Sequence, residues 1–508
     1  MPTPANPGAG VPRPATPPVR LSALVDGRGT LQGADVAVSG ITAATDLIRT
    51  GDLFAGVPGR SAHGASFALA AVAAGAAAVL TDPAGQAFTD GLGVPVVVVP
   101  DVRAVLGPVS ADVYANPSAD MAVLGVTGTS GKTTTTFLMR AGLQAARRVP
   151  GVIGTVATMV GDDEIKTGFT TPEAPEVQAL LAVMRDRGVT DVAMEVSSHA
   201  LAMGRVDGIR FDVAGFTNLS EDHLDFHADM EDYFAAKARL FATGRTRSAV
   251  IVIDDHWGTR LTEVVEGPLA TVTTVGDRRA TWEAVDIAEQ ADGTTTFRAL
   301  GPGVDLLIGS AVPGRYNVAN ALLALAVLAG AGVDPAAAAP AIARASVPGR
   351  MERIDAGQPF LAVVDYSHKP AAVEGALRAL RPLTKGRLIV VLGCGGDRDR
   401  GKRPHMGAIA ARDADLLIVT DDNPRSEDPA AIRRAMLEGV KSVPVAERGQ
   451  VTEIGDRAEA ITAAVVAAGA GDTVLVAGKG HETGQEIAGV VHPFDDRIVL
   501  RAALGTAR

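Results

Sequence analysis

The chain has 508 residues, 47% of them hydrophobic, and carries a formal net charge of −11 at pH 7. That length predicts about three domains. The acidic balance disfavours a general nucleic-acid or anionic-membrane surface, so any anionic ligand must be held locally by loops, helix N-termini and a few arginines. A single cysteine, Cys394, excludes an internal disulfide framework and a cysteine-rich zinc site.

The N-terminal part begins with a proline-rich segment over residues 1–20, which we expect to be a disordered tail because it holds too little apolar surface to order itself. Residues 21–118 combine short β-like runs with an Ala-rich segment at 65–80, which favours a helix leading into a buried strand. We therefore expect a small α/β domain. With no Lys/Arg-led signal peptide and no uninterrupted membrane-length apolar stretch, we expect a cytoplasmic protein. We also expect a monomer.

The second expected domain covers residues 119–347 and contains apolar strand candidates that alternate with helical patterns. The strand candidates are 121–126, 191–196, 213–218 and 249–253. Strands and helices in alternation predict a parallel sheet with helices on both faces.

The third expected domain, residues 348–508, repeats this alternation with strand candidates at 361–365, 387–393, 415–420 and 472–477. It is predicted to be Rossmann-like. A dinucleotide site after its second strand is disfavoured, because Arg398 stands where G-x-G-x-x-G requires glycine. The overall expectation is an α/β protein with three domains: a small N-terminal α/β domain, a central P-loop-type ATPase domain built on a parallel sheet, and this C-terminal domain.

Polar residues follow the ends of several predicted strands: Glu195, Asp365, Asp397, Asp421 and Lys479. Ligands of open α/β sheets bind at the carboxyl ends of the strands. This placement predicts ligand sites at those sheet edges.

A phosphate-binding loop is predicted by residues 123–135, which read VLGVTGTSGKTTT. Gly128 and Gly131 allow backbone N–H groups to face phosphate oxygens, Lys132 can reach the outer phosphates, and the Thr133 hydroxyl can bind Mg²⁺. The first glycine of the strict motif is missing, but the shorter form G-T-x-G-K-T fits. We expect ATP or GTP binding; the alternative is an ordinary strand-to-helix turn with a chance lysine.

Glu195 is the candidate carboxylate for Mg²⁺ at a second strand end, because mostly apolar residues deliver it to the edge of the sheet. A solvated strand-end carboxylate is the alternative. The polar cluster at 197–199 that follows favours the ligand.

His223 lies between Asp222 and Asp225, a pattern that fits either a metal site or a helix N-terminal turn with favourable charge. The other motifs favour the metal site. Lys237 stands between apolar residues in a helical segment, and its spacing alone favours an ordinary surface side chain.

A set of motifs occurs in this order along the chain: GTSGKTTT, TTP, EVSSHAL, NLSEDHLDFH, YFAAKARLF, GRYNVANAL, PGRMERI, GCGGDRDRGKRP, DDNPR and GKGHE. Together they resemble the Mur ligase family from about residue 35 to about residue 500, and most closely its diaminopimelate-adding members. The resemblance implies amide formation in peptidoglycan precursor synthesis. ATP would activate a peptide carboxylate as an acyl phosphate, which an amine then attacks. The implied partners are UDP-N-acetylmuramoyl-L-Ala-D-Glu, meso-diaminopimelate and ATP.

The resemblance also implies two Mg²⁺ ions. Thr133 and Glu195 would hold the first, while Glu195 and His223 would share the second. Lys237 matches the lysine that is carbamylated in the family. The resemblance therefore implies a modified active-site lysine and not the ordinary surface side chain that its spacing favoured. A carbamate is an anionic oxygen ligand of the kind that Mg²⁺ prefers, whereas an ammonium would repel the ion.

The matched residues fall into four groups by implied role. The catalytic group is Lys132, Glu195, His223 and Lys237. The ATP-binding group is Gly128, Thr129, Ser130, Gly131, Lys132, Thr133, Thr134, Asn317, Asn320, Arg350 and Asp365. The group for the UDP-sugar peptide is Thr45, Thr170, Thr171, Ser197 and Arg205. The diaminopimelate group is Arg398, Asp422, Asn423, Pro424, Arg425, Gly478 and Glu482.

Two positions depart from the family pattern. Met203 stands where relatives often have glutamine, and Thr45 stands where they often have serine. The Met203 departure puts one polar contact in question. At Thr45, the threonine hydroxyl can still donate a hydrogen bond.

Arg425 is expected to choose the amino acid, because diaminopimelate differs from lysine by one carboxylate that a guanidinium can grip with two hydrogen bonds. A surface arginine after an Asn-Pro turn is the alternative. Competing functions are a lysine-adding or folate-type relative and a silent nucleotide-binding member. The silent form should lack at least one of the four catalytic residues, and all four are present.

Overall fold

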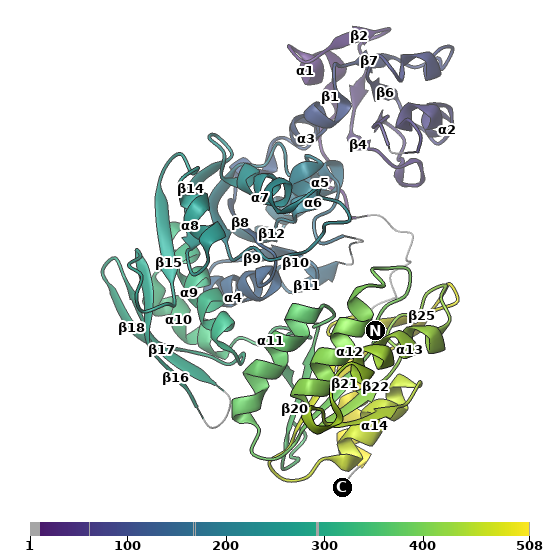
Figure 1. The fold of residues 1–508 in the computed structure, drawn as a ribbon. Coiled ribbons are helices and arrows are strands. Elements are labelled where there is room, and N and C mark those ends of the chain that lie inside the picture. The colour runs from purple at the N-terminus through teal and green to yellow at the C-terminus, as the bar shows by residue number, and fades with distance from the viewer. Residues whose placement is uncertain (1–10, 60, 166, 168, 291–293, 507–508) are drawn as a thin grey trace. The chain divides into compact units, whose positions relative to one another are not determined.

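The computed structural model describes residues 11–59, 61–165, 167, 169–290 and 294–506. The chain divides into two compact units. Figure 1 labels helices and strands along the chain. Unit 1 comprises Met1–Ala284, Ala299–Leu306 and Ala319–Ile342, and unit 2 comprises Val285–Arg298, Leu307–Val318 and Ala343–Arg508. Among the described helices, none has both the length and the apolar composition that crossing a bilayer requires.

The N-terminal region of unit 1 forms a five-stranded sheet in the order β2-β7-β6-β5-β4. Its strands are β2 (Thr30–Gln32), β4 (Gly40–Thr42), β5 (Asp52–Ala55), β6 (Ala78–Thr81) and β7 (Val96–Val98). Neighbours are parallel except β2 and β7. The helices are α1 (Leu21–Val25), α2 (Ala68–Ala73) and α3 (Val102–Val113). The Ala-rich segment is a helix that leads into a buried strand, as predicted.

Residues 11–20 are not a disordered tail, so that prediction is wrong for this part. Strand β1 (Val19–Arg20) pairs with β3 (Ala37–Val38). Arg13 forms an ion pair of 2.5 Å with Asp52, whose side chain is 2% exposed. Such a buried carboxylate needs a cationic partner. Because Arg13 is that partner, the ion pair holds the segment 11–20 in place. Residues 1–10 lie outside the described residues.

The central sheet has eleven strands in the order β11-β10-β9-β12-β8-β13-β14-β15-β16-β17-β18. The strands that position the site are β8 (Ala122–Thr127), β9 (Pro150–Ile153), β12 (Asp191–Glu195), β13 (Phe211–Phe216) and β14 (Thr246–Val252). They are mutually parallel, and four of them match the predicted strands. Their apolar runs are buried as expected for a sheet covered on both faces.

The other central elements are the remaining strands of this sheet and the helices of the central region. The strands are β10 (Thr158–Val160), β11 (Asp163–Ile165), β15 (Leu269–Thr273), β16 (Trp282–Glu289), β17 (Thr295–Gly301) and β18 (Val304–Ser310). The helices are α4 (Lys132–Ala145), α5 (Ala174–Asp186), α6 (Ser198–Ala202), α7 (Met230–Ala238), α8 (His256–Thr262), α9 (Arg315–Gly330) and α10 (Pro335–Arg344).

Unit 2 contains a six-stranded sheet in the order β19-β20-β24-β21-β22-β23, parallel except for β19. Its strands are β19 (Glu352–Arg353), β20 (Leu361–Asp365), β21 (Leu388–Leu392), β22 (Leu416–Val419), β23 (Gln450–Glu453) and β24 (Thr473–Ala477). The four predicted strands are β20, β21, β22 and β24. These mostly parallel sheets, whose strands alternate with helices along the chain, confirm the α/β fold class.

Residues 343–508 of unit 2 also contain α-helices and a hairpin. The helices are α11 (Pro370–Leu380), α12 (Lys402–Asp413), α13 (Pro429–Lys441), α14 (Arg457–Ala467) and α15 (Asp496–Thr506). The hairpin is β25 (Gly484–Ile487) with β26 (Val490–Pro493).

Candidate active site

The phosphate loop joins β8 to α4, in the strand–loop–helix order that the sequence predicted. Gly128 has φ 147° and Gly131 has φ 89°, conformations that side-chain-bearing residues rarely adopt. A Cβ at Gly128 would collide with the Thr217 hydroxyl, and one at Gly131 would collide with the Asn320 amide. The loop therefore needs both glycines.

Asn218, a residue that the sequence analysis did not assign, contacts the loop from the segment just after β13. Its carbonyl accepts from the Thr129 N–H at 2.9 Å, and its Oδ1 accepts from the Ser130 N–H at 3.1 Å. Thr134 is buried on α4. The signal for Asn218 was available, because it opens the NLSEDHLDFH motif directly after a strand.

Two lysines donate to the loop. Lys132 Nζ lies 2.8 Å from the Gly128 carbonyl oxygen and 2.9 Å from that of Thr129. Lys237 Nζ, from α7, also donates to the Gly128 carbonyl at 2.8 Å. The Lys237 residue is 1% exposed, so the interpretation from spacing as a surface lysine is wrong. In this unmodified form, two ammonium groups place positive charge at the loop.

Glu195 ends β12 and is 1% exposed, which excludes a solvated strand-end carboxylate. Its Oε1 accepts from the Thr133 hydroxyl at 2.9 Å and from the Thr155 N–H at 2.8 Å. Hydroxyl and carboxylate oxygens side by side are suitable ligands for Mg²⁺. In the described part of the chain, no group of three His, Cys, Asp or Glu side chains forms a metal site by itself. Mg²⁺ would therefore also need hydroxyl, carbamate, phosphate or water oxygens.

A cluster of rings surrounds His223. Its Nε2 lies 3.3 Å from Asp222 Oδ2, and its ring centroid lies 4.8 Å from that of His199 and 6.1 Å from that of Tyr233. Burial lowers the pKa of His199, and the neighbouring His227 lowers it further. Neutral imidazoles are the form that binds metals. The sharing of one ion by His223 and Glu195 stays a prediction.

Three of the residues expected to bind the UDP-sugar peptide lie around Glu195. The Thr171 hydroxyl donates to the Glu195 carbonyl at 2.9 Å and accepts from the Ser197 N–H at 3.3 Å. Thr155, which bonds the Glu195 carboxylate, lies 2.9 Å from Thr170, hydroxyl to hydroxyl. Three expected peptide residues thus lie next to the candidate Mg²⁺ ligand.

Arg205 extends this group. Its Nη1 donates to the Thr171 carbonyl at 3.1 Å, and its Nη2 lies 2.9 Å from Glu173 Oε1. Nη2 also contacts the Met203 sulfur at 3.4 Å, so Met203 supports the arginine. The guanidinium lies 4.9 Å from the Phe169 ring centroid.

Among the other expected ATP-binding residues, Asn317, Asn320 and Asp365 are buried. Asn320, beside Gly131 in unit 1, is 5% exposed. In unit 2, Asn317 is 1% exposed, and the Arg350 guanidinium lies 4.3 Å from the Tyr366 ring centroid. Asp365, at the end of β20, accepts from the Met351 N–H at 2.7 Å. Thr45 is half-buried at the start of a short 3-10 helix, Thr45–Leu47, in the N-terminal region.

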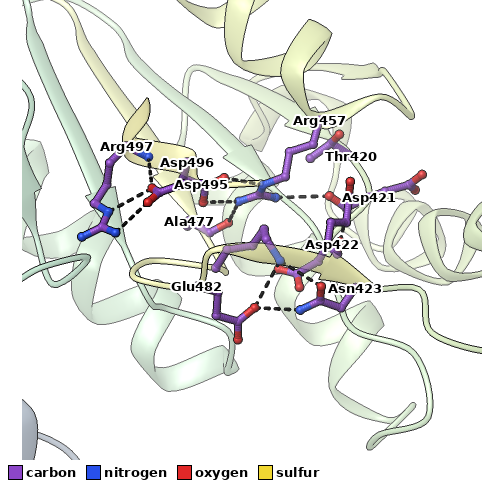
Figure 2. Close-up of polar contacts among 12 residues, drawn as sticks. Thr420, Asp421, Asp422, Asn423, Arg457, Ala477, Glu482, Asp495, Asp496 and Arg497 are labelled. Carbon is purple, nitrogen blue, oxygen red and sulfur yellow. Dashed lines mark hydrogen bonds and ion pairs between the residues drawn. The ribbon is translucent and has the colours of Figure 1, made fainter. Parts of the chain in front are cut away.

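The expected diaminopimelate residues come from loops after β21, β22 and β24. Asn423 Nδ2 donates to Glu482 Oε2 at 2.7 Å (Figure 2). Arg425 donates to the Gly396 carbonyl at 2.6 Å, and its side chain is 24% exposed, so it is not a simple surface arginine. Arg398 is exposed in the loop after β21.

The same region is tightly packed around Gly478. This residue has φ 121°, and a Cβ there would approach the Asp422 carboxylate to 2.5 Å. Asp422 is 6% exposed and Pro424 is buried. The loops after β22 and β24 therefore meet at a position that requires glycine.

Arg457, which the sequence analysis did not identify, ties these two loops together (Figure 2). It is 1% exposed and donates to the carbonyls of Ala477 at 3.0 Å and Asp421 at 3.3 Å. It also makes two hydrogen bonds with Asp496, at 2.7 and 2.8 Å. No local pattern marks it, because its partners come from three other segments.

Comparisons with known proteins show the family to which this fold belongs. A family model described as the Mur ligase middle domain matches residues 126–328, and one described as the Mur ligase, glutamate ligase domain matches residues 349–480. A UDP-N-acetylmuramoyl-L-alanyl-D-glutamate--2,6-diaminopimelate ligase from Streptomyces avermitilis is 53% identical over 501 residues, covering 97% of this chain and 98% of that protein. The chain belongs to the Mur ligase family, as its motifs predicted.

Other relatives extend this result. The ligase of the same name from Corynebacterium glutamicum is 51% identical, covering 95% of this chain and 96% of that protein. A Leifsonia xyli protein named UDP-N-acetylmuramyl-tripeptide synthetase is 45% identical, covering 97% and 96%. A solved structure of a UDP-N-acetylmuramoyl-L-alanyl-D-glutamate--2,6-diaminopimelate ligase has a TM-score of 0.69 at 32% identity, covering 96% of this chain and 99% of that one.

Proposed function

We propose that the protein is an ATP-dependent ligase that joins meso-diaminopimelate to the D-Glu γ-carboxylate of UDP-N-acetylmuramoyl-L-Ala-D-Glu in peptidoglycan precursor synthesis. The structural observation that supports this most is the environment of Glu195. Its carboxylate accepts from Thr133 of the phosphate-loop helix, and its carbonyl accepts from Thr171 of the expected peptide group. Glu195 is thus hydrogen-bonded both to the helix that follows the phosphate loop and to a residue expected to bind the peptide.

The first step needs positioning and charge neutralisation rather than a protein nucleophile. The phosphate loop would hold the ATP phosphates. Lys132 would turn away from the loop carbonyls that it contacts here and toward the outer phosphates. Thr133, Glu195, His223 and a carbamate on Lys237 would hold Mg²⁺, which neutralises phosphate charge when bound. The γ-carboxylate oxygen then attacks the γ-phosphorus, and ADP leaves.

In the second step, the acceptor amine attacks the acyl phosphate carbon, inorganic phosphate leaves, and the amine loses a proton. Thr170, Thr171, Ser197 and Arg205 would orient the dipeptide. Arg425 would bind the far carboxylate of diaminopimelate, which lysine lacks. A site that leaves this guanidinium without a partner when lysine is bound can discriminate against lysine by as much as about 10⁴-fold.

Several parts of this proposal rest on the family resemblance. They are the presence of two Mg²⁺ ions and the carbamylation of Lys237. A cytoplasmic, monomeric protein is a further part of the proposal. The name of the Leifsonia xyli relative does not state its amino acid. The lysine-adding reaction is therefore the alternative that the first experiment must address.

That experiment measures phosphate release by purified protein with ATP, Mg²⁺ and UDP-N-acetylmuramoyl-L-Ala-D-Glu, comparing meso-diaminopimelate with L-lysine. We expect turnover with diaminopimelate. Turnover with lysine alone would contradict the selectivity assigned to Arg425 but keep the ligase. Failure with both, in folded protein that binds ATP, would contradict the proposed function.

A further inference from the structure

Lys479 follows Gly478 in the loop after β24 and is 0% exposed. Its Nζ donates to Asn423 Oδ1 at 2.9 Å and to Glu482 Oε2 at 3.1 Å. A buried ammonium is costly unless it is paired and hydrogen-bonded. Both of these partners belong to the expected diaminopimelate group, and Lys479 itself has no assigned role.

The contacts of Asn423 fix the orientation of its amide. Its Oδ1 accepts from Lys479 Nζ and, at 3.0 Å, from the Glu486 N–H. Its Nδ2 donates to the Glu482 carboxylate at 2.7 Å (Figure 2). A flipped amide would place NH₂ against two donors and a carbonyl against a carboxylate. Asn423 therefore offers a ligand an N–H and not its carbonyl.

Lys479 also balances the negative charge of Glu482. Without it, the carboxylate would repel an incoming amino acid that carries a carboxylate at its far end. With it, the site combines a charge-balanced Glu482, an N–H from Asn423 and the guanidinium of Arg425, whose Nε also lies 3.4 Å from Glu486 Oε2. These groups suit an acceptor with a second carboxylate better than one that ends in an ammonium alone.

We propose that Lys479 is a positioning residue of the acceptor site, which sets Asn423 and Glu482 to receive an amino acid with a second carboxylate. This inference rests on the proposed function. Lys479 acts through its two neighbours and needs no contact with the amino acid.

The test is calorimetric binding of meso-diaminopimelate and L-lysine to the full chain, loaded with a non-hydrolysable ATP analogue, Mg²⁺ and the UDP-muramoyl dipeptide. We expect Lys479→Met to weaken diaminopimelate binding about 10- to 100-fold, the range expected when a buried polar group loses its partner. Lysine binding should fall much less, so the preference should shrink. Affinity for the ATP analogue should not change.

Lys402→Met is the matched control, because the Lys402 ammonium donates to the His368 carbonyl at 2.9 Å in the same unit. It should leave the preference unchanged. If Lys479→Met does not fold, the double variant Lys479→Met/Glu482→Gln removes both charges together. Compared with Glu482→Gln alone, it should bind diaminopimelate more weakly.

An unchanged ratio of the two affinities in the Lys479 variants would overturn the role of Lys479 and leave the proposed function intact. If the unmodified protein bound neither amino acid, both proposals would fail.

Discussion

Lys237 Nζ and the Gly128 carbonyl oxygen lie 2.8 Å apart, and this hydrogen bond connects helix α7 to the phosphate loop across 109 residues of sequence. Lys132 donates to the same oxygen at 2.8 Å. One loop carbonyl thus accepts from two cations. Conversion of Lys237 to a carbamate would replace one of them with an anion and leave Lys132 as the cation of the loop. The expected carbamylation would therefore change the charge at the phosphate loop.

Carbamylation of Lys237 can be tested directly. With ¹³C-labelled bicarbonate, the protein should show a carbamate carbon resonance that Lys237→Met lacks. The Met variant should lose about 10²-fold or more in kcat, because an anionic oxygen ligand for Mg²⁺ is missing. Lys441→Met, at an exposed helix position, should keep both the resonance and the activity. A resonance that persists in Lys237→Met would refute the assignment.

Glu195→Gln tests the proposed Mg²⁺ ligand. Glutamine keeps the volume but removes the negative charge that faces Thr133 and Thr155. We expect kcat for phosphate release to fall about 10²- to 10³-fold, the loss typical for one electrostatic contact in a transition state. Glu164→Gln, on the exposed face of β11, is the control. Full activity of Glu195→Gln at low Mg²⁺ would be incompatible with a ligand role.

Arg425→Ala should reduce the preference for diaminopimelate over lysine by about 10²-fold or more in kcat/KM. The reason is that the far carboxylate would lose its guanidinium partner while the rest of the site remains. Arg434→Ala, on the exposed part of α13, should leave the ratio unchanged. An equal loss for both amino acids would show that Arg425 supports the site without selecting the substrate.

The ion pair between Arg457 and Asp496 should dominate the stability of the loops after β22 and β24. Arg457→Met leaves Asp496 buried without its cation, so we expect the free energy of unfolding to fall by about 3–5 kcal/mol. The double variant Arg457→Met/Asp496→Leu should recover part of this loss. Scanning calorimetry measures both. A double variant less stable than the single one would contradict the charge-burial explanation.

Cys394 should be unreactive in the folded protein. Burial raises the pKa of its thiol to about 12, and the residue is 3% exposed. A thiol reagent at pH 8 should therefore react slowly with folded protein and rapidly in denaturant. Because the folded state retains the thiol proton more tightly than the unfolded chain, this group's contribution to stability is lost as pH rises above about 8.5. Rapid labelling without unfolding would contradict this.

The sequence alone determined the features that depend on local pattern. The strand–loop–helix order around Gly128, the parallel strands that end at Glu195 and Asp365, and the order of the family motifs could all be predicted. Apolar periodicity and glycine requirements are written into neighbouring residues, so they can be recognised without the fold.

Only the tertiary structure decided which side chains are buried and what they contact. Lys237 had the spacing of a surface lysine, and Arg457 carried no signal at all, yet both are buried among partners from distant segments. Residues 11–20 have the composition of a tail, but the buried Asp52 supplies a partner for Arg13. Burial and charge pairing arise when elements far apart in the chain pack together, and no local pattern encodes that packing.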